Sequence, residues 1–197
     1  MIAYLDGKLT YKEPAYAIID VQGVGYEVRI SLQTYSALPE LNERCRLFTY
    51  LNIREDAHIL FAFQEMSEKQ LFLDLVSVSG IGPNTALVML SSLSSVEIRQ
   101  AIITEDLRVI QGIKGIGAKT AQRVILELKD KLKKDHLASG SMTTNLFLGP
   151  NAGARTDAIS ALIVMGIPRP VAEKSVDTLL KKDPNASVED LIKQSLR

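Results

Sequence analysis

The first third of the chain alternates apolar and polar residues as the strands of a half-buried sheet do. The stretch 15-AYAIIDVQGVGYEVRIS-31 is rich in β-branched residues and is interrupted by Gly-Val-Gly, which suits a turn or a bulge. The stretches 46-RLFTYLNI-53 and 58-HILFAF-63 have the pattern of two further strands, joined by 54-REDA-57. Several short strands without helices predict a small closed β-barrel over residues 1–63.

From residue 64 the spacing of apolar residues becomes helical. Ser67 is a suitable N-cap for the stretch 67-SEKQLFLDLVSV-78, with Gln70 at the capping-box position. The stretch 97-EIRQAIITEDLRVIQ-111 has apolar residues at roughly helical spacing with charges between them. These patterns predict an all-helical region over residues 64–134.

The last third of the chain consists of a polar stretch followed by a short helical end. Residues 135–153 are rich in glycine, asparagine and small polar residues, which predicts a flexible linker; Leu146, Phe147 and Leu148 are its apolar exception. Residues 154–197 predict three helices, the first ended by Gly166 and the last capped by Ser187. A module of this size buries only a small core, so we expect it to recruit a partner.

Two segments of the helical region repeat each other. The segments 78-VSGIGPNTALVML-90 and 113-IKGIGAKTAQRVI-125 share Gly-Ile-Gly and Thr-Ala at a constant offset of 35 residues. Each copy has an apolar helix, a Gly-Ile-Gly turn and a second helix, and this repeat length is about that of one helix-turn-helix unit. The sequence therefore predicts two copies of one helical hairpin.

The second copy has two glycines with the spacing of a nucleotide-binding P-loop, G-x-x-x-x-G-K-[ST]. Its lysine is one residue late, because Ala118 separates Gly117 from Lys119. A P-loop also follows a buried strand, whereas the residues before Gly112 have helical spacing. We therefore expect no ATP hydrolysis by this chain itself, and no cofactor.

A Gly-Ile-Gly turn before a helix has the chemistry of a phosphate site. Glycines let the backbone approach a ligand closely, and the first N–H groups of the next helix lack an internal partner at the positive end of the helix dipole. One such turn could be purely structural, but two in register favour contacts with neighbouring phosphates of a nucleic acid. The predicted DNA-binding residues are Gly80, Ile81, Gly82, Asn84, Thr85, Lys114, Gly115, Ile116, Gly117, Lys119, Thr120 and Arg123.

The overall charge is zero, with 23 basic and 23 acidic residues, but the charge is unevenly distributed. Residues 108–134 contain two acidic residues, Glu127 and Asp130, against the basic residues Arg108, Lys114, Lys119, Arg123, Lys129, Lys131, Lys133 and Lys134. A local basic patch can bind phosphate on a neutral molecule. A solvated helix end is the simpler interpretation for Lys131, Lys133 and Lys134.

The remaining composition argues against several other classes of site. Cys45 is the only cysteine, and His58 and His136 show no ligand spacing, so we expect no metal site and no disulfide within the chain. A single cysteine fits a reducing compartment. The apolar runs are too short to span a membrane, and no signal peptide is visible, so we expect a cytoplasmic protein without a membrane partner.

The tandem turns and the order of segments resemble the RuvA family, the Holliday-junction-binding subunits of the bacterial branch-migration machinery. The resemblance covers essentially the whole chain. It implies an α+β multidomain protein, with an OB-type barrel at 1–63, a tandem helix-hairpin-helix domain at 64–134 and a three-helix module at 154–197. That module would bind the hexameric AAA+ motor RuvB.

The family resemblance also implies an assembly and a role. A homotetramer, with one or two tetramers per junction, would bind four-way DNA without reading its sequence. The RuvC resolvase would join a larger complex, and the activity would serve recombination, DNA repair and the SOS response to DNA damage. The chain would have no catalytic residue of its own within this ATP-dependent helicase complex.

The resemblance assigns roles to residues outside the turns as well. Glu55 and Asp56, at the tip of the predicted hairpin, would form an acidic pin that repels phosphates at the junction centre; by composition alone they are ordinary turn residues. Relatives tend to have lysine where this chain has Asn84 and Ala118, and nearby cations would compensate. Leu162, Met165 and Ile167 are the expected motor-binding surface, with the module's own core as the alternative for Leu162.

Two other classes of function remain open at this point. A nuclease or glycosylase would use the hairpins to hold DNA, but it needs a nucleophile or a metal site, and no segment supplies a convincing set. A protein-binding adaptor would make both turns structural, which leaves the repeated glycines and the basic cluster unexplained.

Overall fold

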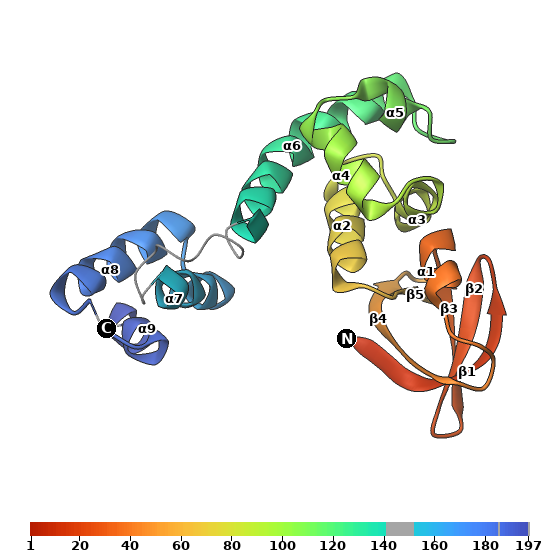
Figure 1. The fold of residues 1–197 in the computed structure, drawn as a ribbon, viewed down its shortest axis with the longest axis horizontal. Helices are drawn as coiled ribbons and strands as arrows, with labels where there is room; N and C mark the ends of the chain where they lie inside the picture. The colour runs from red at the N-terminus through yellow and green to blue at the C-terminus, as the bar shows by residue number, and fades with distance from the viewer. Residues whose placement is uncertain (141–151, 185, 197) are drawn as a thin grey trace. The chain divides into compact units, whose positions relative to one another are not determined.

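The computed structural model describes residues 1–140, 152–184 and 186–196 (Figure 1). It divides into two compact units, Met1–Leu137 and Ala138–Arg197. The helix that joins them in sequence, α6 (Ala118–Gly140), continues past residue 134, where the pattern places the start of the linker. The rest of the expected linker up to residue 151, including Leu146–Leu148, lies outside the described residues.

The N-terminal part of the first unit is a closed β-barrel. Its strands are β1 (Tyr4–Glu13), β2 (Tyr16–Val21), β3 (Val24–Ile30), β4 (Arg44–Ile53) and β5 (His58–Phe63). They pair in the order β1-β2-β3-β5-β4 with β4 closing on β1, and only the β3–β5 pair is parallel. A short helix, α1 (Leu32–Ala37), follows β3 and is capped by Ser31. The predicted OB-type barrel is confirmed, although the pattern predicts neither β1 nor α1.

The alternation of apolar and polar residues does not predict β1, and a close contact with the neighbouring strand β2 explains why. Leu5 and Leu9 of β1 point into the barrel core, but Gly7 stands between them. A Cβ atom at Gly7 would lie 2.1 Å from the carbonyl oxygen of Asp20 on β2. The close approach of the β2 backbone therefore requires glycine at this position. Because glycine has no apolar side chain, the alternation typical of a strand is interrupted here.

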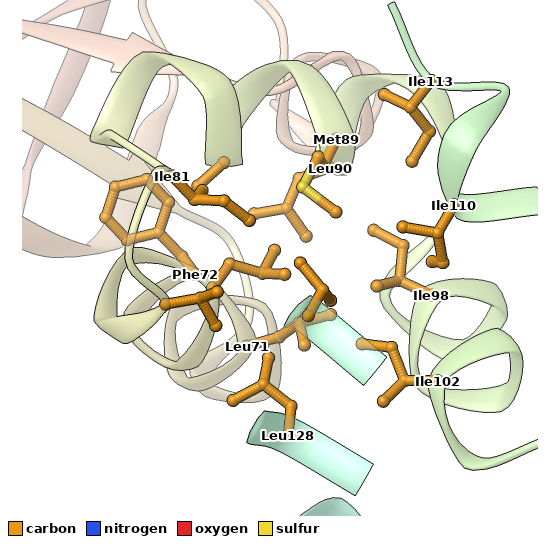
Figure 2. Packing of buried hydrophobic residues seen from close by; sticks show 14 of the residues in the cluster. Leu71, Phe72, Ile81, Met89, Leu90, Ile98, Ile102, Ile110, Ile113 and Leu128 are labelled. Carbon is orange, nitrogen blue, oxygen red and sulfur yellow. The ribbon is translucent and has the colours of Figure 1, made fainter. Parts of the chain in front are cut away.

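Helices α2 to α6 of the first unit share one core. They are α2 (Met66–Ser77), α3 (Pro83–Ser92), α4 (Ser95–Ile103), α5 (Leu107–Gln111) and α6. Figure 2 shows the converging side chains, among them Leu71, Met89, Ile98, Ile110 and Leu128. Phe61 and Phe63 of β5 belong to the same core, with ring centroids 5.3 and 4.9 Å from that of Phe72 on α2. The outer face of β5 thus joins the barrel to the helices.

A buried polar cluster also fixes the barrel to α2. The hydroxyl of Ser31 donates to Glu68 Oε1 at 2.5 Å, and that of Thr34 donates to Oε2 at 2.8 Å. Thr34 Oγ1 in turn accepts from the backbone N–H of Gln64 at 3.3 Å. Burial raises the pKa of the Glu68 carboxyl, and the two hydroxyl hydrogen bonds oppose that shift. The cluster, defined by Ser31, Thr34 and Glu68, sets where α2 leaves the barrel.

Two predictions about helix ends in the first unit are wrong. The N-cap of α2 is Glu65, without a side-chain hydrogen bond, so Ser67 does not cap that helix. The helical stretch 97–111 is broken, because Glu105 has a left-handed φ of 59° and Asp106 accepts from two N–H groups to begin α5.

In the described residues no single helix has the length and apolar composition to cross a membrane, although α3 and α4 meet both criteria together across a 98° bend.

The second unit is built from α7 (Ala152–Val164), α8 (Arg169–Lys182) and α9 (Val188–Ser195), which confirms the three-helix module. Its small core contains Ala158, Ile159, Leu162, Ala172, Val176, Ala186 and Leu191. Arg155 binds Asp177 through two hydrogen bonds, of 2.6 and 2.9 Å, and so joins α7 to α8. Ser187 accepts from the N–H of Asp190 at 3.1 Å, which confirms the predicted cap of α9.

Candidate nucleic-acid interface

The two Gly-Ile-Gly turns have the same backbone geometry. The first glycine of each, Gly80 and Gly115, has a left-handed φ of 96° and 90°. That region costs a residue with a side chain about 1–2 kcal/mol. The N–H groups of Ile81 and Ile116 each donate to the carbonyl three residues earlier, at 3.0 and 3.1 Å. The turn conformation by itself explains the first glycine.

The central isoleucines anchor the turns to the core. Ile81 is 4% exposed and Ile116 is 5% exposed. Figure 2 shows Ile81 pointing into the core of the helical region, together with Ile113, which precedes the second turn. The side chains of Ile81 and Ile116 are buried, and their N–H groups already donate hydrogen bonds within the turns. These isoleucines therefore position the turns, and any contact with a ligand would be made by neighbouring residues.

The second glycine of each turn has a different basis. Gly82 has an ordinary φ of −87°, and a Cβ atom built on Gly82 or on Gly117 meets nothing within 4 Å in the described chain. Both glycines are exposed. Gly82 is the N-cap of α3 and provides no side-chain hydrogen bond to the first-turn N–H groups. Neither internal strain nor internal crowding requires glycine at these two positions in the described chain. A glycine there leaves the first-turn N–H groups open to close approach by a ligand.

The residues after each second glycine differ between the copies. The first copy continues with Asn84 and Thr85, and the second with Lys119 and Thr120; both threonines are half-buried. Lys119 and the preceding Lys114 are exposed, and neither is ion-paired within the described part of the chain. A lysine in the first turn of a helix is unfavourable beside the dipole unless an anion is also bound.

Two arginines contact the first turn from other parts of the unit. Arg123 of α6 donates through Nη1 to the carbonyl oxygen of Ser79 at 3.1 Å, and its Nε lies 3.8 Å from Glu127 Oε1. Arg29 of β3 donates through Nη1 to Asn84 Oδ1 at 3.0 Å. Sequence reasoning places Arg123 at the second turn alone, and it misses Arg29 because 55 residues separate it from Asn84.

Part of the basic cluster on α6 is used inside the protein. Lys129 hydrogen-bonds Glu105, which raises the pKa of the ammonium and lowers that of the carboxyl. Lys131 Nζ lies 2.6 Å from Oδ1 of the buried Asp74 on α2. These two lysines hold α6 in place, so of the basic cluster's residues near the turns, Lys114, Lys119 and Arg123 are the ones left to face a ligand.

Comparison with known proteins agrees with this arrangement along the whole chain. Residues 1–62 match the family model of the RuvA N terminal domain, residues 72–130 that of the SAM-like Helix-hairpin-helix tandem, and residues 153–197 that of the RuvA, C-terminal domain. Proteins named Holliday junction branch migration complex subunit RuvA are similar over 100% of the chain. The one from Cytophaga hutchinsonii is 52% identical over 99% of its own length, and that from Amoebophilus asiaticus is 46% identical over 100%. The protein of that name from Pseudomonas syringae is 39% identical over 98% of its length.

The chain belongs to the RuvA family. The identity extends through the barrel, the tandem hairpins and the C-terminal helices, so it does not depend on the hairpin motif alone. The structure also shows where the other residues lie that the resemblance to the RuvA family singled out, the acidic pin and the motor-binding surface.

The expected acidic pin lies at the connection between β4 and β5. The N–H of Arg54 donates to the carbonyl of Ala57 at 2.8 Å and closes the turn, while Glu55 and Asp56 are exposed at its tip. In the described chain neither carboxylate has a hydrogen-bond or ion-pair partner, so the turn does not use them. No group of three or more His, Cys, Asp or Glu side chains in the described chain is placed to hold a metal ion.

The expected motor-binding residues of the RuvA-type C-terminal domain fall into two groups. Gly166, with φ 91°, ends α7: its N–H donates to Ile163 and that of Ile167 to Leu162, at 2.9 and 3.0 Å. This Schellman pattern brings Ile167 against Leu162. Leu162 is fully buried in the small core and Ile167 is partly buried, so Leu162 is corrected to a core residue.

Of the three expected motor-binding residues, Met165 is the exposed one, and other exposed apolar residues lie beside it. Met165 is 58% exposed and the adjacent Val164 is 88% exposed. Val171, early in α8, is also exposed. Sequence reasoning misses Val164 and Val171, although helical periodicity from the buried Ala158 and Leu162 places Val164 off the core face.

Proposed function

We propose that this chain is the subunit that binds four-way DNA junctions in a branch migration complex, through phosphates and not through bases. The observation that carries the proposal is the duplicated turn: both copies have the same backbone geometry, and the second glycine of each lies open to solvent. The names of the similar proteins, Holliday junction branch migration complex subunit RuvA, support the same function.

Phosphate contact suits an activity that must ignore sequence. Backbone N–H groups, Lys114 and Lys119 position a DNA backbone but read no base edge. During branch migration the base pairs at the crossing change with every step, so base-specific contacts would stop the movement. Glu55 and Asp56, unpartnered at the barrel tip, repel phosphates and select an open junction centre over continuous duplex.

The proposal includes the assembly and its partners. Four copies form a homotetramer that matches the four arms of a junction, alone or facing a second tetramer, in the cytoplasm. The C-terminal unit holds the hexameric ATP-driven motor RuvB, and the RuvC resolvase joins a larger complex. The chain positions DNA and the motor performs the ATP-dependent work, so no residue of this chain is assigned a catalytic role.

A competition gel shift tests the proposal. An immobile four-way junction is set against linear duplex of equal length and composition over a salt series. We expect the junction to win by orders of magnitude, with a log-log salt slope of about 0.9 per phosphate contact. Equal binding of both DNAs would leave a general DNA-binding protein, and binding of neither would make both turns structural.

The same assay tests the acidic pin. Glu55→Gln combined with Asp56→Asn is expected to bind linear duplex more tightly and so to reduce the preference for the junction. Glu40→Gln combined with Glu43→Gln removes two exposed carboxylates from the loop before β4 and is the control for loss of negative charge from the barrel. Unlike Glu55 and Asp56, these carboxylates have partners, Lys12 Nζ at 3.8 Å and the N–H of Glu40 at 3.3 Å. If both double variants keep the full preference, the pin has no role in selectivity.

A further inference from the structure

The two turns do not carry the same charge, although their backbones match. The second copy has a cation at residues 114, 119 and 123. At the offset of 35 residues, the first copy has Ser79, Asn84 and Val88, none of which is charged. The first turn therefore has the geometry of a phosphate site without any cation of its own sequence.

Tertiary contacts bring guanidinium groups to two of these three uncharged positions. Arg123 is hydrogen-bonded to Ser79, which is equivalent to Lys114, at 3.1 Å. Arg29 is hydrogen-bonded to Asn84, which is equivalent to Lys119, at 3.0 Å. The first turn thus receives one arginine from the barrel and one from the second hairpin, at the positions where the second turn has its own lysines.

Asn84 is well suited to hold an arginine. Its Oδ1 is a neutral acceptor, so it orients the guanidinium without neutralising the positive charge, as a carboxylate would. Arginine has five N–H donors, and the bond to Asn84 uses one of them. Arg29 is only half-buried and therefore partly exposed to solvent. Arginine is the side chain that binds phosphate oxygens in a bidentate manner.

We infer that Arg29 of the barrel is a phosphate-binding residue of the first turn, held in place by Asn84. The inference rests on the proposed function and adds a ligand-contacting residue to it. The ligand is a phosphodiester of the DNA backbone. The barrel then completes a phosphate site on the helical region. Asn84 holds the cation of Arg29 at a position where a lysine would itself provide the positive charge.

The test measures junction binding and its salt slope for full-length variants. Arg29→Gln is expected to weaken binding by about tenfold or more, as for removal of a charge-assisted hydrogen bond, and to lower the slope by about 0.9 for each phosphate that is no longer neutralised. Arg44→Gln is the matched control, because Arg44 is also an exposed barrel arginine but is paired with Asp6 at 2.7 Å. Unchanged affinity and slope for Arg29→Gln would overturn the inference.

A second variant separates phosphate binding from a tether between barrel and α3. Arg29→Gln with Asn84→Lys removes the Arg29–Asn84 hydrogen bond but places an ammonium at the position equivalent to Lys119. Recovery of most of the affinity and of the salt slope supports phosphate binding. Failure to recover, together with a lowered melting temperature for Arg29→Gln, would mean that Arg29 is only a tether.

Lys119→Gln shows which proposal has failed in a negative result. If Lys119→Gln weakens junction binding and Arg29→Gln does not, the proposed function stands and the role of Arg29 is refuted. If neither variant changes junction binding, the role of Arg29 is refuted and the proposed function depends on the backbone N–H groups alone. If the wild-type chain does not bind the junction in the same assay, the proposed function itself is refuted.

Discussion

The two glycines of one turn have separate physical reasons. Gly80 has a left-handed φ, so its lack of a side chain serves the fold. Gly82 has an ordinary φ and faces open space, so we propose that its lack of a side chain serves the approach of a phosphate. The residue between them is buried and fixes the turn to the core. On this proposal, a motif that looks uniform in sequence contains residues that serve folding and residues that serve binding.

This division is tested with one substitution at two neighbouring positions. Gly80→Ser is expected to lower the free energy of unfolding by about 1–2 kcal/mol, because φ is 96° there. Gly82→Ser is expected to leave the stability unchanged or slightly higher, because serine is a better N-cap than glycine. Denaturant unfolding measures both.

In junction binding, the direct effect is expected in Gly82→Ser, the variant whose stability should be unchanged or slightly higher. Folded Gly82→Ser is expected to bind four-way DNA at least about tenfold more weakly, because its side chain occupies the space through which a phosphate reaches the first-turn N–H groups. Wild-type affinity in Gly82→Ser would show that no ligand approaches this glycine.

Between secondary-structure elements, the first unit depends on contacts that join barrel and helices. Phe61 and Phe63 of β5 pack on α2, and Glu68 of α2 is buried against the hydroxyls of Ser31 and Thr34. These contacts set the position of the first turn relative to β3, and so bring Arg29 within hydrogen-bond distance of Asn84. A phosphate site shared by strand and helix needs this fixed relation.

The buried Glu68 predicts a pH dependence of stability. Burial raises its pKa from a usual value near 4.5, so the folded state holds the proton at pH values where the unfolded state has released it. The contribution of Glu68 to stability is fully present below the unfolded pKa and is lost as the pH rises through the higher folded pKa. Relative to Glu68→Gln, the wild type should therefore lose free energy of unfolding as the pH rises.

Urea unfolding of wild type and Glu68→Gln between about pH 4 and pH 8 measures this difference. Other carboxyls whose pKa is lowered, such as those of Glu97 and Glu105, titrate in both proteins and cancel in the comparison. A wild type that gains stability over the variant as the pH rises would contradict the assignment.

At the scale of the whole molecule, we propose that DNA contact and partner contact lie in different units. The candidate phosphate site lies within Met1–Leu137, and the exposed Val164 and Met165 lie in Ala138–Arg197. Val164 and Met165 are adjacent exposed apolar residues outside the small core, and we propose that they are part of the docking surface for the motor. The two activities should therefore respond to different substitutions.

Val164→Asp combined with Met165→Asp tests that separation in the full-length chain. Junction binding should be unchanged, while stimulation of the RuvB-type motor's ATPase should fall by at least about tenfold, as for truncation of an interface hot spot. Val96→Asp is the control, since Val96 is 73% exposed near the start of α4. Normal motor stimulation by the double variant would place the docking surface elsewhere.

The features that depend on neighbours along the chain can be predicted from the amino-acid sequence. Alternation gave strands β2 to β5, helical spacing gave the helical region, and Gly166 and Ser187 marked the ends they occupy in the structure. The repeat at 35 residues was visible because its two copies are compared letter by letter. Periodicity, capping and turn chemistry act within a few residues, so they can be read without a fold.

The features that join residues far apart in the sequence become visible in the folded structure. The need for Gly7, the contact of Arg123 with Ser79 across 44 residues and that of Arg29 with Asn84 across 55 leave no local pattern. The burial of Leu162, which the pattern leaves open, is likewise decided by how α7 packs on α8 and α9. Which side chains meet is fixed by the packing of whole elements, and the cations at the first turn are a product of that packing.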